Sequence, residues 1–136
     1  MVERLKPGQE LFQAIEEIVV RHNIEAGTIV SLVGSVNEAA LRFSDSPDAT
    51  VVAGPLEIVS VTGTVAKSSC HIHLAVADKE GTTYGGHLMH GSTVYTTVEL
   101  IIIDLSTSHT FSRQYCSLSG YEELTVQLKE QSEKED

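Results

Sequence analysis

The 136-residue sequence has few positively charged residues, and this shortage limits what the protein can bind. Nine Lys and Arg stand against 19 Asp and Glu, which gives a formal net charge of −10. A chain this acidic repels phosphate backbones over most of its surface, and no cluster of Lys or Arg interrupts the pattern. Direct DNA binding is therefore disfavoured from the outset.

Aromatic residues, cysteines and long apolar runs are also scarce. Aromatics make up 5% of the chain and Trp is absent, so a core has to be built from Val, Ile and Leu. No apolar run approaches the ~18 residues of a membrane span, and residues 1–8 lack the apolar stretch of a secretion signal. The two cysteines, Cys70 and Cys116, form no C-x-x-C pair, which is typical of reduced thiols. These features predict a cytoplasmic protein without membrane contact.

Length and composition predict one globular domain. With 41% hydrophobic and 21% charged residues, the chain resembles ordinary folded proteins, and wholesale disorder is excluded. The last residues are charged and carry no apolar stripe. We therefore expect a single domain over residues 1–125 and a charged, disordered tail over residues 126–136.

Hydrophobic periodicity predicts one helix near the start, followed mostly by sheet. Residues 9–22 place apolar side chains three and four positions apart, as in an amphipathic helix. A Gly54-Pro55 pair is expected to break the chain before the third strand. Exposed sheet edges would favour self-association. The β-branched and alternating segments predict strands over residues 28–36, 39–43, 56–65, 71–77, 94–103 and 110–115.

Three histidines form the most informative pattern. On a strand, His71 and His73 project from the same face, with Cα atoms about 6.6 Å apart. Gly85-Gly86 carries His87 in what we interpret as a loop, and a loop without Cβ atoms can approach the sheet closely. Three neutral imidazoles with an open fourth position are the arrangement that catalytic zinc sites use. The spacing thus predicts a divalent metal site.

An alternative interpretation of the histidines needs no metal. The H-x-H pattern is common on sheet surfaces, where such side chains are simply hydrogen-bonded, and Gly-Gly can shape a turn. His90 competes with His87 as the third ligand. His22 and His109 are expected to be surface residues.

Two acidic residues within apolar strands are candidates for catalytic groups. A buried carboxylate is costly unless it is paired or coordinated, so Glu57 or Glu99 could act as a general base or support a ligand histidine. Glu57 and Glu99 could equally face solvent on an alternating strand, although the neighbours of Glu99 alternate less. Arg42 is a candidate partner for either carboxylate.

Several motifs together resemble the PPC (plants and prokaryotes conserved) domain, and in particular its stand-alone prokaryotic members. The resemblance extends over nearly the whole chain to about residue 125. The matching segments are Leu5 to Gly8, Gly34-Ser35 with Ala39 and Leu41-Arg42, Gly54 to Gly63, His71-x-His73-Leu74 with Asp78, Gly81, Gly85 to Leu88 with Gly91 and Val94, Thr97-x-Glu99, and Arg113 with Gly120-Tyr121 and Leu124.

The resemblance implies an α+β fold with a mixed, largely antiparallel β-sheet and one main helix, assembled as a homotrimer. It implies a regulatory or DNA-associated role, but the Arg-Gly-Arg-Pro hook that contacts DNA in plant members is missing here. Prokaryotic members keep the histidines, which supports a zinc site at His71, His73 and His87. Cys116 stands where the family pattern after Arg113 has an acid.

A more distant similarity links this fold to acetolactate decarboxylase, a zinc enzyme whose metal is held by three histidines that include an H-x-H pair. Two hypotheses follow. The first is a trimeric metal-binding module that acts through protein partners. The second is a zinc-dependent lyase or hydrolase acting on a small oxo-acid or ester, with Glu57 or Glu99 moving a proton.

Overall fold

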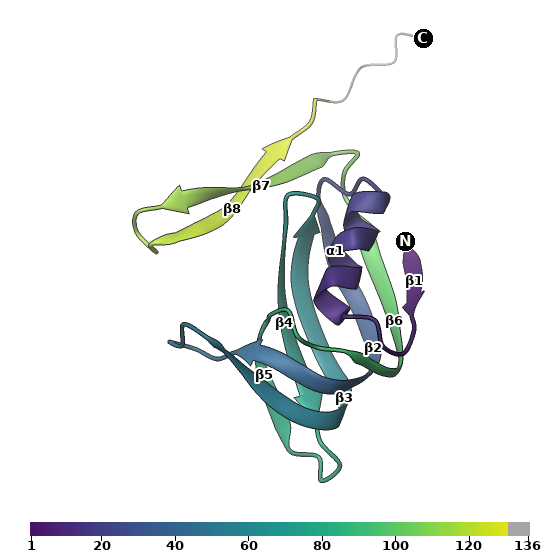
Figure 1. Ribbon diagram of the computed structural model, residues 1–136. Helices are drawn as coiled ribbons and strands as arrows, with labels where there is room; N and C mark the ends of the chain where they lie inside the picture. Colours follow the sequence, from purple (N-terminus) through teal and green to yellow (C-terminus); the bar gives the residue numbers. More distant parts are fainter. Residues whose placement is uncertain (131–136) are drawn as a thin grey trace.

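The computed structural model describes residues 1–130 and shows one helix and eight strands among them (Figure 1). No helix in this part of the chain is long and apolar enough to cross a membrane. The elements follow in the order β1 (Val2–Leu5), α1 (Leu11–Arg21), β2 (Gly27–Arg42), β3 (Ala49–Ala66), β4 (Ser69–Ala77), β5 (Thr83–Leu88), β6 (Val94–Asp104), β7 (His109–Cys116) and β8 (Tyr121–Leu128).

Helix α1 confirms the helix expected over residues 9–22. Its first turn is capped by Glu10, whose carboxylate accepts a hydrogen bond from the Gln13 backbone N–H at 2.6 Å. Leu11, Ile15 and Val19 are fully buried on one stripe of the helix. That stripe explains why α1 lies across one face of the large sheet in Figure 1.

The large sheet has six strands in the order β1-β6-β2-β3-β4-β5. The end of β2 also pairs with β5, through Leu41 with Leu88 and Arg42 with His87. Strands β2, β3, β4 and β5 therefore form a closed circuit of pairings. Every strand pairing among residues 1–130 is antiparallel, so the described part of the chain lacks the parallel pair that a mixed sheet requires.

The two faces of this sheet differ in composition. The inner face, which faces α1, carries the core, and strand alternation supplies it: Ile72, Leu74 and Val76 of β4 are at most 2% exposed. As the shortage of aromatics predicts, the core consists mostly of aliphatic side chains. The outer face bears polar residues and several exposed aliphatic ones, namely Val30, Val33, Val59, Ile101 and Ile103.

The strand boundaries differ from the sequence prediction in several places. The strands expected at residues 28–36 and 39–43 are one strand, β2, in which a bulge at Val36/Glu38 absorbs the irregular pattern. Gly54-Pro55 lies inside β3 and does not end it, because both residues fall at the register shift between Leu56 and Ala53, where no ladder hydrogen bond is needed from Pro55. Strands β1, β5 and β8 were not predicted, since they are short, glycine-rich or polar.

Strands β7 and β8 form a separate hairpin that extends from one end of the large sheet (Figure 1). Their pairing runs from His109 with Leu128 to Cys116 with Tyr121. Because β8 continues to Leu128, residues 126–128 of the segment expected as a tail belong to a strand. Residues 131–136 of that segment lie outside the described residues.

Candidate metal centre

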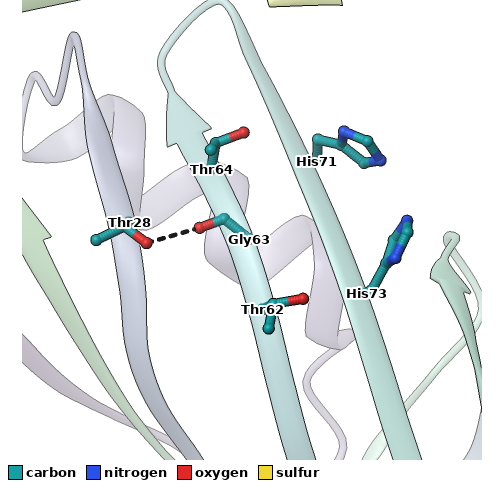
Figure 2. A pocket seen from close by; sticks show the side chains of 6 residues that line it. All are labelled: Thr28, Thr62, Gly63, Thr64, His71 and His73. Atoms are coloured by element: carbon teal, nitrogen blue, oxygen red, sulfur yellow. Dashed lines mark hydrogen bonds between the residues drawn. The ribbon is translucent and has the colours of Figure 1, made fainter.

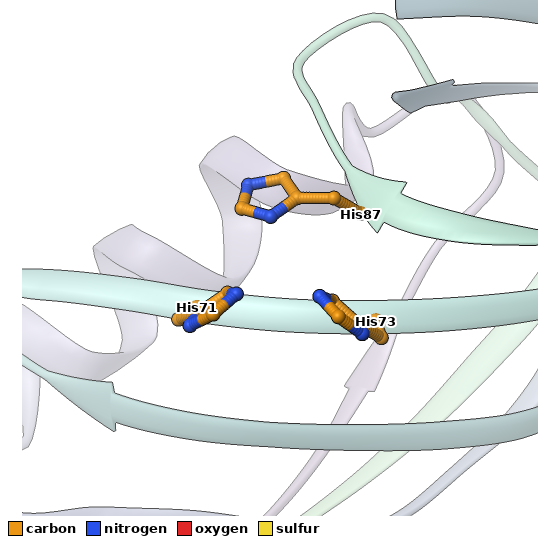
Figure 3. A group of neighbouring side chains, drawn as sticks. All are labelled: His71, His73 and His87. Carbon is orange, nitrogen blue, oxygen red and sulfur yellow. The ribbon is translucent and has the colours of Figure 1, made fainter. Parts of the chain in front are cut away.

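Strand β4 positions the first two histidines. Ile72 and Leu74 point into the core, so His71 and His73, which alternate with them, project from the outer face and are exposed. The two rings lie nearly perpendicular, with centroids 5.1 Å apart. Figure 3 shows both imidazoles on the same side of β4, as the alternation predicts.

Strand β5 supplies the third histidine. His87 pairs directly with His73 across the β4–β5 ladder, so their side chains share a face. The segment Gly85-Gly86 is part of this strand and not a loop, which corrects the sequence interpretation. A Cβ on Gly86 would lie 2.8 Å from the Arg42 carbonyl oxygen, so glycine is what lets β5 approach β2.

The three imidazoles converge (Figure 3). Their ring centroids are 4.9 Å apart for His71 and His87 and 5.7 Å apart for His73 and His87, and one nitrogen from each ring lies within 4.8 Å of the others. Nitrogens bound to one zinc ion at about 2.0–2.1 Å are at most ~4 Å apart. Small rotations of the exposed His71 and His73 side chains toward the half-buried His87 would close the difference, so the donor set fits a divalent metal.

The surroundings favour the neutral imidazoles that metal binding requires. Burial lowers the pKa of His87 to about 4, and the positive charge of Arg42 acts in the same direction. Burial also lowers the pKa of His71, with contributions from His73 and Arg113 and an opposing one from Glu123. At neutral pH both rings therefore have a free lone pair for a metal ion.

A groove of about 320 Å³ borders the histidines (Figure 2). The strand register builds it, because Thr62 pairs with His73, Thr64 pairs with His71, and Thr28 pairs with Thr64. The Thr28 hydroxyl donates a hydrogen bond to the Gly63 carbonyl oxygen at 3.0 Å. These threonines were not identified from the sequence, although their alternation in β3 could have placed them opposite the H-x-H pair.

The structure does not bring the candidate catalytic acids to the cluster. Glu57 pairs with Ala77, four residues along β4 from His73, which is about 13 Å. Glu99 lies on β6, pairs with Arg4 of β1, and is separated from β4 by β2 and β3. Both carboxylates are exposed, as the solvent-facing alternative expected, because the outer face of the sheet is solvated.

The remaining histidines lie elsewhere. His90, the alternative third ligand, lies 3.4 Å from the Glu10 carboxylate and stacks edge-on against Phe12. His22 is partly exposed and contacts Glu3 at 2.9 Å. His109 is half-buried, with Nδ1 2.7 Å from the Ser108 hydroxyl. None of them joins the cluster within residues 1–130.

Comparison with solved structures places the chain among proteins of the same fold. A hypothetical protein from Salmonella cholerae-suis (Salmonella enterica) is 40% identical, with a TM-score of 0.91 over 95% of this chain and 93% of that one. A metal-containing protein from Archaeoglobus fulgidus is 28% identical, with a TM-score of 0.73 over 92% and 91%. A "putative DNA-binding protein" from Ralstonia eutropha JMP134 is 23% identical, with a TM-score of 0.79 over 91% and 89%, and shows the fold alone.

Comparison with curated proteins adds a larger relative. The bifunctional protein GlmU of Synechococcus sp. strain JA-3-3Ab is 40% identical over 124 residues, which are 91% of this chain and 20% of that protein. The chain thus spans about a fifth of the length of the curated relatives it matches. A family model matches residues 1–106, from β1 to the end of β6. The resemblance inferred from the sequence is thereby confirmed: the chain belongs to the Plants and Prokaryotes Conserved (PCC, or PPC) domain family.

Proposed function

We propose that the chain is a metal-binding module that assembles as a homotrimer and holds one zinc ion through His71, His73 and His87. The observation that carries the proposal is the convergence of three imidazole nitrogens within 4.8 Å on one face of the sheet. The depressed pKa values of His71 and His87 support it, because neutral imidazole is the form that binds metal. The Archaeoglobus neighbour, named as metal-containing, gives independent support.

Elemental analysis tests the site directly. Protein purified without an affinity tag should contain about one zinc ion per chain, and His73→Ala should abolish the loading because two imidazoles retain a divalent ion poorly. If the variant keeps the trimer and the melting temperature of the metal-loaded wild type, the site is not structural. Wild-type protein that takes up no divalent metal, or a variant that loads normally, contradicts the proposal.

Exposed apolar side chains support self-association. The outer face carries Val30, Val59 and Ile103, each at least half exposed, and the β7–β8 hairpin adds Leu118 and Leu128, both more than three-quarters exposed. Association of several copies would cover exposed aliphatic side chains of this kind. Native mass spectrometry should find a species of three 14.7-kDa chains, and a monomer at micromolar concentration contradicts the trimer.

Any DNA-associated role is proposed to run through protein partners. The net charge of −10 opposes contact with a duplex, whereas the Ralstonia neighbour carries a DNA-binding name. A gel shift at low salt should therefore give no complex with duplex DNA. A complex that weakens steeply as salt rises would overturn this part of the proposal.

A zinc-dependent lyase or hydrolase acting on a small oxo-acid or ester is the second candidate. The exposure of His71 and His73 beside the groove favours it, because an ion there keeps an open coordination position. Glu57 and Glu99 lie too far away to transfer a proton at this ion. Turnover of 2-oxo acids or p-nitrophenyl esters that requires the metal supports the enzyme, and its absence in zinc-loaded protein contradicts it.

A further inference from the structure

Two arginines flank the histidine cluster from opposite sides. Arg42 of β2 is the cross-strand partner of His87, so its side chain leaves the sheet on the same outer face. Arg113 of β7 reaches the other side of the cluster, where its guanidinium donates hydrogen bonds to Ser69 and Thr64 hydroxyls, each at 3.2 Å. Thr64 in turn pairs with His71 across β3 and β4.

Neither arginine is neutralised by the described part of the protein. Both are half-buried, and no carboxylate of residues 1–130 lies within 4.0 Å of either guanidinium. Arg21 shows the usual behaviour on this acidic chain, since it is bound to Glu3 at 2.7 Å. The charges of Arg42 and Arg113 both reach His71, and only Glu123 opposes them there. The cluster is thus a local positive site in a protein of net charge −10.

We infer that this site binds the carboxylate or phosphate group of a small anionic ligand beside the three imidazoles, attracted by the charges of Arg42 and Arg113 and bound by at least one of the two guanidinium groups. A guanidinium fork matches the oxygens of either group with two parallel hydrogen bonds. The groove adds neutral donors. Because the Thr64 hydroxyl accepts from Arg113, its own hydrogen is free to point at a ligand, and the exposed Thr62 hydroxyl lies next to it.

The register gives the site its shape. One row of cross-strand neighbours consists of Thr62, His73, His87 and Arg42. A second row consists of Thr28, Thr64 and His71, and Arg113 contacts its Thr64. An anion in the groove therefore meets threonine hydroxyls and imidazoles, while Arg42 ends the first row and Arg113 contacts Thr64 in the second. The inference rests partly on the proposed metal site, since a bound zinc ion would strengthen the attraction of the anion.

Calorimetric titration with sodium pyruvate and with inorganic phosphate tests the inference on zinc-loaded and metal-free protein. At least one anion should bind, and Arg42→Gln or Arg113→Gln should weaken its affinity about tenfold, the loss expected for one charge-assisted contact. Arg21→Gln is the matched control and should change affinity less than twofold. Preference for pyruvate identifies a carboxylic acid as the ligand, and preference for phosphate identifies a phosphorylated compound.

The inference is overturned if neither anion binds in either form, or if both arginine variants bind like the wild type. Because Arg113 also ties the hairpin to β3 and β4, Arg113→Lys and Arg42→Gln decide the matter should Arg113→Gln fail to fold. Zinc content is measured in the same samples. If the anion binds through the arginines but the protein takes up no zinc, only the metal site is refuted. If the protein takes up zinc but the arginine variants bind the anion like the wild type, only the anion site is refuted.

Discussion

The two faces of β4 show how one strand can serve both stability and chemistry. Ile72 and Leu74 are buried in the aliphatic core, whereas His71 and His73, one residue away, are exposed on the outer face. The inner side chains are held by packing on all sides, and the outer ones by cross-strand neighbours alone. Substitutions on the two faces should therefore separate folding from metal binding.

The largest expected effect is on the inner face. Leu74→Ala removes a side chain that is 2% exposed, and truncations of buried leucine cost about 2–5 kcal/mol of unfolding free energy. Urea denaturation of the metal-free protein measures the loss. The folded fraction of the variant should still bind one zinc ion per chain. A fully folded variant that has lost zinc binding would show that the two faces are not independent.

A smaller effect is expected where β5 meets β2. Gly86→Ala places a Cβ 2.8 Å from the Arg42 carbonyl oxygen, and the backbone must move to relieve the overlap. Such overpacking costs about 1–3 kcal/mol, and it should also displace His87 and weaken zinc affinity.

Gly85→Ala is the matched control for this change. Its nearest neighbour, the Leu74 carbonyl oxygen, is 3.7 Å away, an ordinary contact. Zinc titration of both variants compares them. Equal affinities would mean that the close approach of β5 to β2 does not position His87.

On the outer face, the low pKa of His87 should make the stability of the metal-free protein depend on pH. An unfolded histidine takes up a proton near pH 6.5, whereas His87 in the fold, with a pKa of about 4, does so only below that value. The unfolded state therefore binds more protons between these pH values, and stability falls as pH drops from 6.5 towards 4. Urea denaturation at pH 7.5 and at pH 5 should show a smaller loss of unfolding free energy for His87→Gln than for the wild type. Equal losses would contradict the depressed pKa.

The smallest effect is expected at His90. This side chain is 60% exposed and makes long contacts with Glu10 and Glu16, at 3.4 and 3.5 Å. Exposed pairs of this kind contribute at most about 1 kcal/mol, so His90→Gln should shift unfolding only slightly. Zinc content should not change. A variant that loses zinc would make His90 a ligand and would contradict His87 as the third one.

The parts of the fold with strong periodicity could be predicted from the sequence. The apolar stripe of α1 and the alternation of β4 depend on local residues, and both appear where expected. Strand β5 could not be found this way, because Gly85-Gly86 has a low strand propensity and pairs only through tertiary contacts. Likewise, the bulge at Val36/Glu38 joins two predicted strands into one, and only the pairing with β3 shows it.

The candidate site was predictable for its histidines but not for their neighbours. His71 and His73 share a face by alternation alone, and their meeting with His87 was expected from spacing, although the element carrying His87 was misassigned. That these residues hold a metal stays a proposal. Arg113 is 42 residues from His71, and no local pattern signals that it lies near the cluster. Glu57 faces solvent between buried Leu56 and Ile58, which is the alternative that its alternating strand left open.

The closed circuit of β2, β3, β4 and β5 has a consequence for how a bound ion would leave. His73 has a hydrogen-bonded neighbour strand on each side, so its backbone cannot swing outward without breaking two ladders at once. Exchange of an ion would then proceed by rotation of the His71 and His73 imidazoles, which already face water, whereas His87 is half-buried. The metal would then exchange with the surrounding solution by side-chain rotation alone, while every strand pairing around the site stays intact.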